Sequence, residues 1–404
     1  MSTYVLSPGR EKSLLHRHPW VFSGAVARIK GEVSSGATVD IMAEDGRFLG
    51  RAAASPASQI RARIWSFDPN EKIDASFFER RLAAATAWRE PLFTSGNTAA
   101  RLVHAESDGL PGLIVDRYVD TLVVQILSAG AELWRETIFD SLVRVTGCTH
   151  VFERSDVEVR ALEGLPARSG PVRGNGSTQI TIAEHGLKYV VDIAAGQKTG
   201  FYLDQRENRR RVEELARGRD VLNCFGYTGG FALSALRGGA RSVYSVDSSS
   251  GAVQAAERNA GLNNFDNSRA QWVEADVFKH LRLLRDQARQ FDLIVLDPPK
   301  LAPTVQHVDR AARAYKDINL LGFKLLRPGG LLVTFSCSGG VGIELFQKIV
   351  AGAAVDARVD AQIVERLGPS ADHPVLLSFP EGDYLKGLLV RLGGAAGLEF
   401  SSTP

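Results

Sequence analysis

Three patterns of hydrophobic and polar residues follow one another along the 404-residue chain. In the first, residues 1–72, short strand-like stretches lie between glycines. One of them, Ile60–Trp65, alternates apolar and charged residues, which is typical of a strand with one buried face and its arginines toward solvent. We therefore expect a small β-rich barrel or sandwich in this region.

The second pattern, residues 73–185, mixes helical and strand-like periods and indicates a small α+β domain. A helix is predicted at 75–90, with Asp74 as its N-cap. The stretch 168–177 is rich in Gly, Pro and Arg, which is typical of a linker or flexible arm. The other predicted elements are strands at 101–106, 113–118, 121–127 and 150–154 and a helix at 131–145.

The third pattern, residues 186–393, alternates strands and helices at regular spacing. Short apolar runs such as Leu293–Leu296 suit strands that are buried on both faces. Such alternation predicts an α/β fold with a doubly wound parallel sheet, which binds ligands at the carboxyl ends of its strands. The low-complexity tail, 394–404, is expected to be flexible. Strands are predicted at 220–224, 242–247, 270–274, 292–297, 331–336, 361–366 and 384–391, and helices at 205–216, 229–238, 249–261, 276–288, 311–326 and 341–354.

Composition narrows the class of protein. The length predicts two to three domains, and a net charge of +2 excludes a bulk polycation. The three cysteines, Cys148, Cys224 and Cys337, form no C-x-x-C pair, so we expect neither a disulfide framework nor a metal site, and we expect a reducing, cytoplasmic compartment. No apolar run is long enough for a membrane span, and the first residues lack the apolar region of a secretory signal.

The first three predicted strands of the sheet end in residues that suit a nucleoside. A glycine-rich turn, Asn223–Gly230, follows the first strand but lacks the G-x-G-x-x-G pattern of dinucleotide sites. Asp247 ends the second strand, where a carboxylate can accept hydrogen bonds from ribose hydroxyls. Asp276 follows the third and is a candidate for an adenine amino group, or equally a helix N-cap. Together they indicate an adenosine-bearing cofactor without a pyrophosphate.

The fourth and fifth strands end in residues that suit catalysis. Asp297-Pro298-Pro299-Lys300 forms a stiff loop, because proline cannot continue a parallel ladder. Cys337 lies beyond the apolar run of the fifth strand, flanked by serines and glycines, where a substrate could reach its thiol. We interpret Cys337 as a nucleophile, and Cys224 and Cys148 as packing residues.

These residues resemble the class I S-adenosylmethionine-dependent methyltransferases and, more closely, a bacterial family of 23S ribosomal RNA cytosine-5 methyltransferases, the large-subunit methyltransferase I family. The resemblance covers nearly the whole chain. The segments that carry it are His18–Gly24, Gly109–Tyr118, Gly196–Arg206, the Asp-Pro-Pro-Lys loop, Ser336–Ser338, Ala371–Val375 and Tyr384–Gly387.

The resemblance implies a PUA RNA-binding domain at 1–72, a central α+β domain at 73–185 and a Rossmann-like methyltransferase domain at 186–393. It implies S-adenosyl-L-methionine as cofactor and ribosomal RNA as partner, with no membrane; we also allow for a homodimer. The residues it implies for the cofactor are Lys198, Phe201, Gln205, Asn223, Phe225, Gly226, Tyr227, Thr228, Gly229, Asp247, Asp276 and Asp297. Those for the RNA are Arg10, Arg17, Trp20, Pro298, Pro299 and Lys300.

Two basic stretches are open to a second interpretation. The cations and the aromatic ring of residues 10–20 suit phosphate binding and base stacking, but also an ordinary solvated face. The run Arg206–Arg211 is offset by nearby glutamates, so an exposed helix face is equally consistent with it.

Carbon 5 of cytosine is a poor nucleophile, so a thiolate must first add to carbon 6, and we assign this step to Cys337. Asp297 would contact the N3/N4 edge of the base, and the two prolines would hold a base flipped out of its stack. Asp372 and His373 are candidates for removing the carbon-5 proton, although a turn role is at least as consistent. The alternatives are uridine-5 or guanine-N2 methylation, or a non-catalytic RNA-binding assembly factor.

Overall fold

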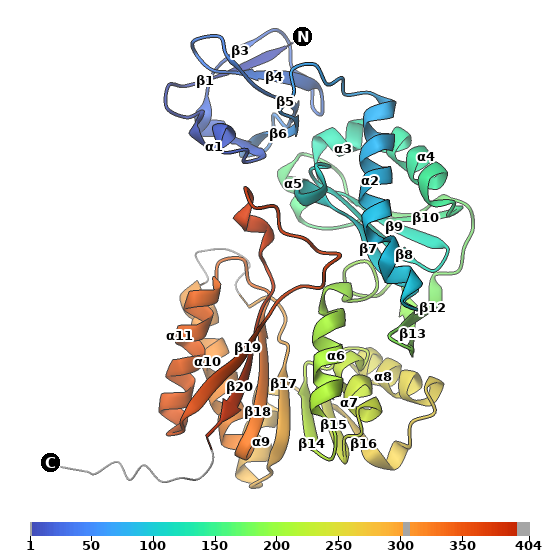
Figure 1. Cartoon of the computed structure of the whole chain (residues 1–404), viewed down its shortest axis with the longest axis vertical. Coiled ribbons are helices and arrows are strands. Elements are labelled where there is room, and N and C mark those ends of the chain that lie inside the picture. Colours follow the sequence, from blue (N-terminus) through green and yellow to red (C-terminus); the bar gives the residue numbers. More distant parts are fainter. Residues whose placement is uncertain (1, 302–307, 394–404) are drawn as a thin grey trace, which may run out of the picture. The chain divides into compact units, whose positions relative to one another are not determined.

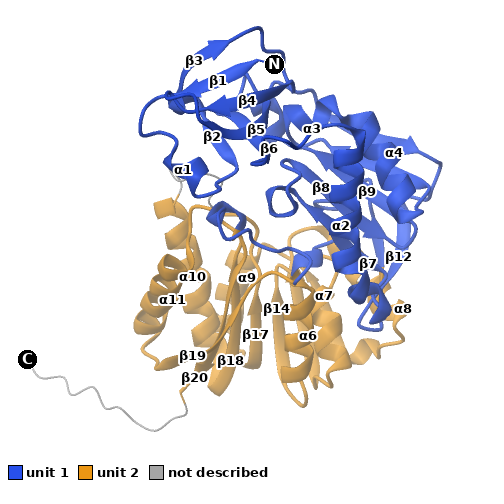
Figure 2. Cartoon of the chain, turned by 45° about the horizontal axis from the view of Figure 1, so that its top comes forward, with its two compact units in different colours: residues 1–186, 190–204, 371–382 blue, residues 187–189, 205–370, 383–404 orange. Residues whose placement is uncertain are grey.

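The computed structural model describes residues 2–301 and 308–393 as an α/β fold (Figure 1). The predicted flexible tail, 394–404, lies outside the described residues. None of the described helices combines the length and apolar character needed to cross a membrane. The chain forms two compact units (Figure 2), so domain boundaries at residues 72 and 185 stay predictions. The first unit comprises 1–186, 190–204 and 371–382, and the second 187–189, 205–370 and 383–404.

The start of the first unit is a six-stranded, mostly antiparallel sheet in the order β2-β6-β5-β4-β1-β3. Its strands bury Tyr4, Ile41 and Ile64 in one apolar core. The prediction that both arginines of β6 face solvent is wrong for Arg63, which is buried and pairs with Glu163 at 2.7 Å. The elements are β1 (Thr3–Leu6), α1 (Lys12–Leu15), β2 (Trp20–Phe22), β3 (Val26–Lys30), β4 (Thr38–Met42), β5 (Phe48–Ala54) and β6 (Ile60–Ser66).

The rest of the first unit is built on a five-stranded sheet in the order β11-β10-β9-β8-β7. Asp74 caps α2 as predicted, because its carboxylate accepts the N–H of Phe77 at 3.0 Å. The elements are α2 (Ala75–Thr94), β7 (Ala99–His104), β8 (Leu113–Tyr118), β9 (Thr121–Ile126), α3 (Ala129–Leu133), α4 (Arg135–Thr146), β10 (His150–Ser155), α5 (Val159–Leu162) and β11 (Arg168–Arg173). A separate two-stranded sheet joins β12 (Gln179–Glu184) and β13 (Leu187–Asp192).

The predicted linker at 168–177 is in part an edge strand, so that prediction is wrong. β11 pairs antiparallel with β10, and its arginines bind carboxylates of the preceding elements. Arg173 lies 2.8 Å from Asp140, and Arg168 lies 3.2 Å from Glu132. Because partners far away in sequence hold this segment, it forms a strand although its local composition is typical of a loop.

The second unit contains a seven-stranded sheet in the order β16-β15-β14-β17-β18-β20-β19. Six strands run in the same direction, but β20 runs antiparallel to both of its neighbours, β18 and β19, so the sheet is mixed rather than wholly parallel. The strands are β14 (Asp220–Cys224), β15 (Ser242–Asp247), β16 (Ala270–Glu274), β17 (Phe291–Leu296), β18 (Leu326–Ser336), β19 (Ala361–Leu367) and β20 (Lys386–Leu392). The helices are α6 (Arg206–Leu215), α7 (Gly230–Arg237), α8 (Ser250–Leu262), α9 (Val277–Asp286), α10 (Val308–Leu325) and α11 (Ile343–Ala357).

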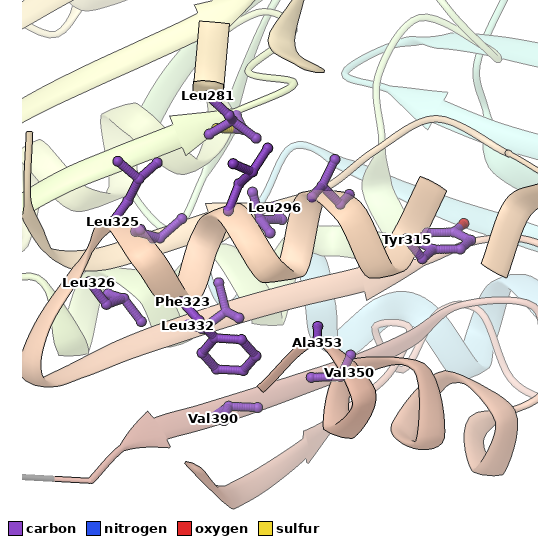
Figure 3. Close-up of a cluster of buried hydrophobic side chains, with 14 of the residues drawn as sticks. Leu281, Leu296, Tyr315, Phe323, Leu325, Leu326, Leu332, Val350, Ala353 and Val390 are labelled. Atoms are coloured by element: carbon purple, nitrogen blue, oxygen red, sulfur yellow. The ribbon is translucent and has the colours of Figure 1, made fainter. Parts of the chain in front are cut away.

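Both faces of the central strands are buried, as the apolar runs predict. Ile294 and Leu332 belong to the core on one face, whereas their neighbours Leu293 and Val333 belong to the core on the other. Figure 3 shows the first of these cores, in which side chains of α10 lie close to those of β17 and β18. Packing on two faces fixes the register of each strand, since a shift by one residue would exchange the two faces.

The basic run at the start of α6 does not form a fully exposed face. Arg206 and Arg209 are buried, whereas Arg210 and Arg211 reach the surface and lie near Glu214. A side-chain carbon added to Gly230 would lie 2.9 Å from Cδ of Arg209, which shows how closely α6 packs on the start of α7. The exposed-face interpretation is therefore wrong for two of these arginines.

The segment 371–382 returns to the first unit late in the chain. Asp372 is buried there: its Oδ2 accepts the backbone N–H of Arg101 at 2.9 Å, and its carbonyl accepts from Arg89 at 3.3 Å. His373 is also buried and lies 3.1 Å from the Asp372 carboxylate. These contacts give Asp372 and His373 a structural role.

His104 faces this segment, with its ring 5.2 Å from that of His373. Burial, together with the charges of Arg101, His373 and Arg89, lowers the pKa of His104 to about 2, whereas the charge of Asp372 opposes this shift. Nδ1 of His104 lies 3.2 Å from the Arg101 guanidinium, which can only donate. The folded protein therefore holds His104 neutral.

We predict that His104→Gln flattens the acid side of the stability curve. Below pH 6.5 the unfolded chain binds a proton at His104 and the folded chain does not, so wild-type stability falls as the pH falls. At 1.36 kcal/mol per pH unit, this loss of wild-type stability reaches about 2 kcal/mol at pH 5. Urea unfolding between pH 5 and 7 measures it, and parallel curves for the two proteins would contradict it.

Gly387 in β20 should be intolerant of a side chain. It lies opposite Phe335 of β18, and an added Cβ would come within 2.5 Å of the Phe335 ring and 2.8 Å of Leu367. We predict that Gly387→Ala lowers the free energy of unfolding by about 1–3 kcal/mol, the usual cost of overpacking. Urea denaturation measures this loss. The control, Gly261→Ala, has open space around the new carbon and should be neutral or stabilising; equal losses would refute the steric argument.

Candidate active site

The glycine-rich turn after β14 contains three residues in the left-handed region of backbone conformation. Phe225 and Tyr227 have positive φ angles of 60° and 45°, and Gly229 has 89°. A side chain on Gly226 would meet Ser245 Oγ at 2.5 Å. The turn is therefore tightly packed against β15, and it leads directly into the N-terminus of α7.

Asp247, at the end of β15, holds this turn. One carboxylate oxygen accepts the N–H of Tyr227 at 2.8 Å, and the other accepts the N–H of Ser249 at 2.9 Å. Each oxygen keeps a further lone pair, since a carboxylate has about four acceptor sites. Asp247 thus both supports the turn and can accept bonds from a ligand beside it.

Two buried polar atoms in the turn have no hydrogen-bond partner among the described residues. They are Oδ1 of Asn223 and Oγ1 of Thr228. The amide nitrogen of Asn223 does have a partner, Ser245 Oγ at 3.0 Å. An unsatisfied buried polar atom costs about 1–3 kcal/mol, so the turn is better suited to a polar ligand than to remaining empty.

Asp276 caps a helix, which is one of the two roles that the sequence leaves open. Its Oδ1 accepts the N–H of Lys279 at 2.9 Å at the start of α9. The preceding residue, Ala275, donates its N–H to the carbonyl of Asp247, so the ends of β15 and β16 are adjacent. Asp276 is exposed and has its second oxygen available.

Asp297 follows β17 and is positioned by a relay from α6. Gln205 is buried and donates from Nε2 to Oδ1 of Asp297 at 3.1 Å, while its own Oε1 accepts from Asn208 at 2.6 Å. In the loop that follows, Pro298 is buried, whereas Pro299 and Lys300 are exposed. The loop thus has one face in the fold and one face free to meet a substrate.

Cys337 follows β18, the strand next to β17, and its thiol reaches the same loop. Sγ lies 3.9 Å from the carbonyl oxygen of Pro298, and the side chain is half-buried. The other two cysteines are buried, and burial raises the pKa of the Cys224 thiol. Cys148 packs in the core of the first unit. The structure therefore supports a packing role for these two.

Two residues that the sequence interpretation missed hold the segment around Cys337. Lys386 of β20 is buried and donates from Nζ to the carbonyls of Ser338 at 2.9 Å and Tyr384 at 2.8 Å. Tyr315 of α10 bonds through its hydroxyl to Ser338 Oγ at 3.0 Å. A lysine two residues before the apolar run Leu388–Val390 was the available signal for Lys386.

The charge of Lys386 is coupled to the site. Burial lowers the pKa of its ammonium group, and the nearby charges of Asp383 and Cys337 raise it, whereas Lys300 lowers it. A thiolate at Cys337 and the ammonium of Lys386 therefore favour each other.

The remaining predicted site residues belong to the first unit. Lys198 has a positive φ of 58°, and Phe201 is buried with its N–H donating to the Tyr118 hydroxyl at 3.3 Å. Arg10 and Arg17 are exposed. Trp20 is engaged within the unit, since its Nε1 donates to Glu106 at 2.8 Å.

Comparisons with known proteins agree with this arrangement. A family model described as S-adenosylmethionine-dependent methyltransferase matches residues 169–391, and one described as PUA-like domain matches 5–67. "Ribosomal RNA large subunit methyltransferase I" of Cronobacter sakazakii is 53% identical over 385 residues, which cover 95% of this chain and 97% of the relative. The protein of that name from Escherichia coli O9:H4 is 51% identical over 390 residues, or 96% and 98%.

This chain belongs to the ribosomal RNA large subunit methyltransferase I family. Its fold is also that of SMU.776, solved as a complex with SAH (TM-score 0.86, 22% identity, 97% of this chain and 100% of the other). A structure from Streptococcus mutans described as SAM-dependent gives a TM-score of 0.83 at the same identity and coverage.

The cofactor of this S-adenosylmethionine-dependent family fits the residues at the turn. Asp247 has acceptor capacity for two ribose hydroxyls, and the turn at Gly226 keeps the backbone free of side-chain atoms. The unsatisfied atoms of Asn223 and Thr228 are suited to further polar contacts with such a ligand. The absence of a phosphate-binding G-x-G-x-x-G pattern agrees with a cofactor that has no pyrophosphate.

We predict that Asp247→Asn weakens binding of S-adenosylhomocysteine by about tenfold, equivalent to losing one charge-assisted hydrogen bond. The asparagine amide can accept hydrogen bonds only through its oxygen. The N–H of Tyr227, the N–H of Ser249 or a ribose hydroxyl therefore loses its acceptor. Titration calorimetry measures the change. Asp286→Asn removes an exposed carboxylate at the far end of α9 and serves as the control; equal affinities for the two variants would count against a cofactor role.

Proposed function

We propose that the chain methylates carbon 5 of a cytosine in 23S ribosomal RNA through a covalent adduct between Cys337 and carbon 6. The observation that carries the proposal is the half-buried thiol of Cys337 beside the Asp297–Lys300 loop, at the ends of two adjacent parallel strands. Membership of the family supports an RNA substrate, because its members are named for the large ribosomal subunit.

The chemistry requires a nucleophile in this position. The Cys337 thiolate adds to carbon 6, and the electron pair of the 5,6 double bond makes carbon 5 nucleophilic. S-adenosylmethionine, when bound, would supply the methyl group from its sulfonium centre and would be left as the neutral thioether. Transfer of the carbon-5 proton to water or another base then re-forms the 5,6 double bond, and the bond between carbon 6 and Sγ breaks to release the Cys337 thiolate.

The chain's other residues assist by position and charge. Lys386 offers a cation near Cys337, and its two carbonyl contacts hold the segment that carries the thiol. Asp297, fixed by Gln205, is directed at the N3/N4 edge of the base. Pro298, Pro299 and Lys300 receive the flipped base, since the reacting ring must leave its stack.

For the cofactor, we propose contacts from the turn after β14, from the ends of β15 to β17 and from the segment before α6. The residues are Lys198, Phe201, Gln205, Asn223, Phe225, Gly226, Tyr227, Thr228, Gly229, Asp247, Asp276 and Asp297. We place the activity in the cytoplasm, where ribosomal RNA is available. The homodimer that we allow for has no support from the relatives or from the single chain.

Uridine is the second candidate base. A single accessible thiol suffices for 5-methyluridine formation, and the other two cysteines of this chain are buried. Guanine-N2 methylation, in contrast, attacks through an amine and would leave Cys337 without a role. A non-catalytic assembly factor would not need the cofactor turn or Asp297.

We predict that Cys337→Ala abolishes methyl transfer, with a loss of at least about a thousandfold, because carbon 5 becomes nucleophilic only after a thiolate has added to carbon 6. The measurement is mass mapping of protein-free large-subunit RNA incubated with labelled S-adenosylmethionine. Cys148→Ala, which alters a buried thiol in the other unit, is the matched control and keeps the activity. Calorimetry with S-adenosylhomocysteine confirms that the inactive variant is folded.

The position of the label separates the alternatives. Label at carbon 5 of a cytosine supports the proposal, and label at carbon 5 of a uridine shifts it to the second base. Label on an exocyclic nitrogen, or an active Cys337→Ala protein, would overturn the mechanism.

A further inference from the structure

The first unit contains a pocket of about 460 Å³ that is lined by none of the candidate catalytic or cofactor-binding residues. Its walls come from β6, α2, the segment 106–109, Arg17 and the returning segment 371–382. Sites for small organic ligands commonly occupy roughly 300–1,000 Å³, so the pocket is large enough for a nucleotide unit.

An exposed aromatic side chain lies at this pocket. Trp88 of α2 is 56% exposed, although large aromatic residues usually bury most of their surface. Its neighbour Arg89 lies with its guanidinium 4.7 Å from the Trp88 ring centroid, but is itself buried and bound to Asp108. An exposed tryptophan next to a cavity offers a stacking surface for a nucleic-acid base.

The charges of the pocket favour an anion. Its two carboxylates are already bound within the unit: Asp108 by both guanidinium nitrogens of Arg89, at 2.7 and 2.8 Å, and Glu106 by Trp20 at 2.8 Å. Arg17 is exposed and has no ion pair within the described part of the chain. Arg81 of α2 also lines the pocket, but it is paired with Glu71 at 3.3 Å. The available cation of the pocket is therefore Arg17.

The backbone holds Arg17 in an unusual conformation. Its φ angle of 65° lies in the left-handed region that favours glycine, yet an arginine stands there. Its guanidinium lies 4.8 Å from the Phe67 ring centroid, and its carbonyl accepts from Ser378 at 2.9 Å. Phe67 and the segment 371–382 thus hold Arg17, whose side chain lines the pocket.

We propose that this pocket binds an unpaired nucleotide of the RNA substrate, with its base stacked on Trp88 and its phosphate bound by Arg17. This inference rests on the proposed function for the identity of the substrate. It transfers the stacking role expected of Trp20 to Trp88, because the Trp20 ring packs on Phe379 at 4.7 Å and its Nε1 is engaged. The pocket would bind a nucleotide of the RNA other than the one that is methylated.

The test compares Trp88→Ala, Trp88→Phe and Arg17→Ala with the wild type. The probe is a short fluorescein-labelled single-stranded oligoribonucleotide whose binding is followed by anisotropy. We expect Trp88→Ala to weaken binding about tenfold, within the range measured for loss of base stacking, and Trp88→Phe to restore most of it. Arg17→Ala should weaken binding and reduce its salt dependence by about one phosphate contact.

The matched controls lie in the region of the six-stranded sheet, in the same unit but outside the pocket. Phe22→Ala removes an aromatic ring that is 48% exposed, and Arg47→Ala removes an exposed cation. Both should bind the oligonucleotide as the wild type does. With ribosomal RNA as substrate, Trp88→Ala should raise KM and leave kcat and S-adenosylhomocysteine affinity unchanged.

The two proposals fail in distinguishable ways. If the wild type transfers no methyl group to RNA but Trp88→Ala still selectively weakens oligonucleotide binding, the proposed function falls and the pocket stands. If methylation proceeds and the Trp88 and Arg17 variants bind RNA like the controls, the pocket proposal is overturned. Loss of binding in Trp88→Phe equal to that in Trp88→Ala would also overturn the stacking argument.

Discussion

The parallel pairing of β17 with β18 is the constraint on which the candidate site depends. Leu296 lies opposite Thr334, so both strands end at the same edge of the sheet. The loop that begins at Asp297 and the segment that carries Cys337 therefore meet, although 39 residues separate them in the sequence. Because each strand is buried on both faces, the apolar core itself sets the position of the thiol.

The parallel core was the most predictable part of the fold. The strands at 220–224, 242–247 and 270–274 agree with the structure to the residue, since continuous apolar runs between turn signals leave little choice of period. The antiparallel direction of β20 could not be predicted from its own residues, because it depends on the path that the preceding segment takes back to the sheet. β11 failed for a similar reason: its arginines pair with acidic residues of distant elements.

The position of a cysteine relative to an apolar run also distinguished the buried Cys224 from the half-buried Cys337. Cys224 ends such a run and is buried, whereas Cys337 lies beyond one and is half-buried. What the sequence could not indicate were partners that come from other strands. Lys386 reaches the Cys337 segment only because β20 pairs with β18, and no local pattern announces that contact.

Buried arginine pairs explain why net charge says little about this chain. Arg63 with Glu163, Arg89 with Asp108 and Arg101 with Asp116 all lie within the first unit. Breaking such a pair leaves an uncompensated buried charge, which typically costs about 3–5 kcal/mol. These cations are therefore committed to the fold, whereas the exposed Arg17 remains for a partner.

The returning segment has a consequence for biosynthesis. Residues 371–382 complete the first unit, yet they leave the ribosome after nearly all of the second unit. Until then, the backbone N–H of Arg101 lacks the carboxylate of Asp372, and the pocket lacks one wall. The unit that begins at the N-terminus thus cannot finish folding first, as vectorial synthesis usually allows. The first unit is therefore complete only after most of the second unit has been synthesised.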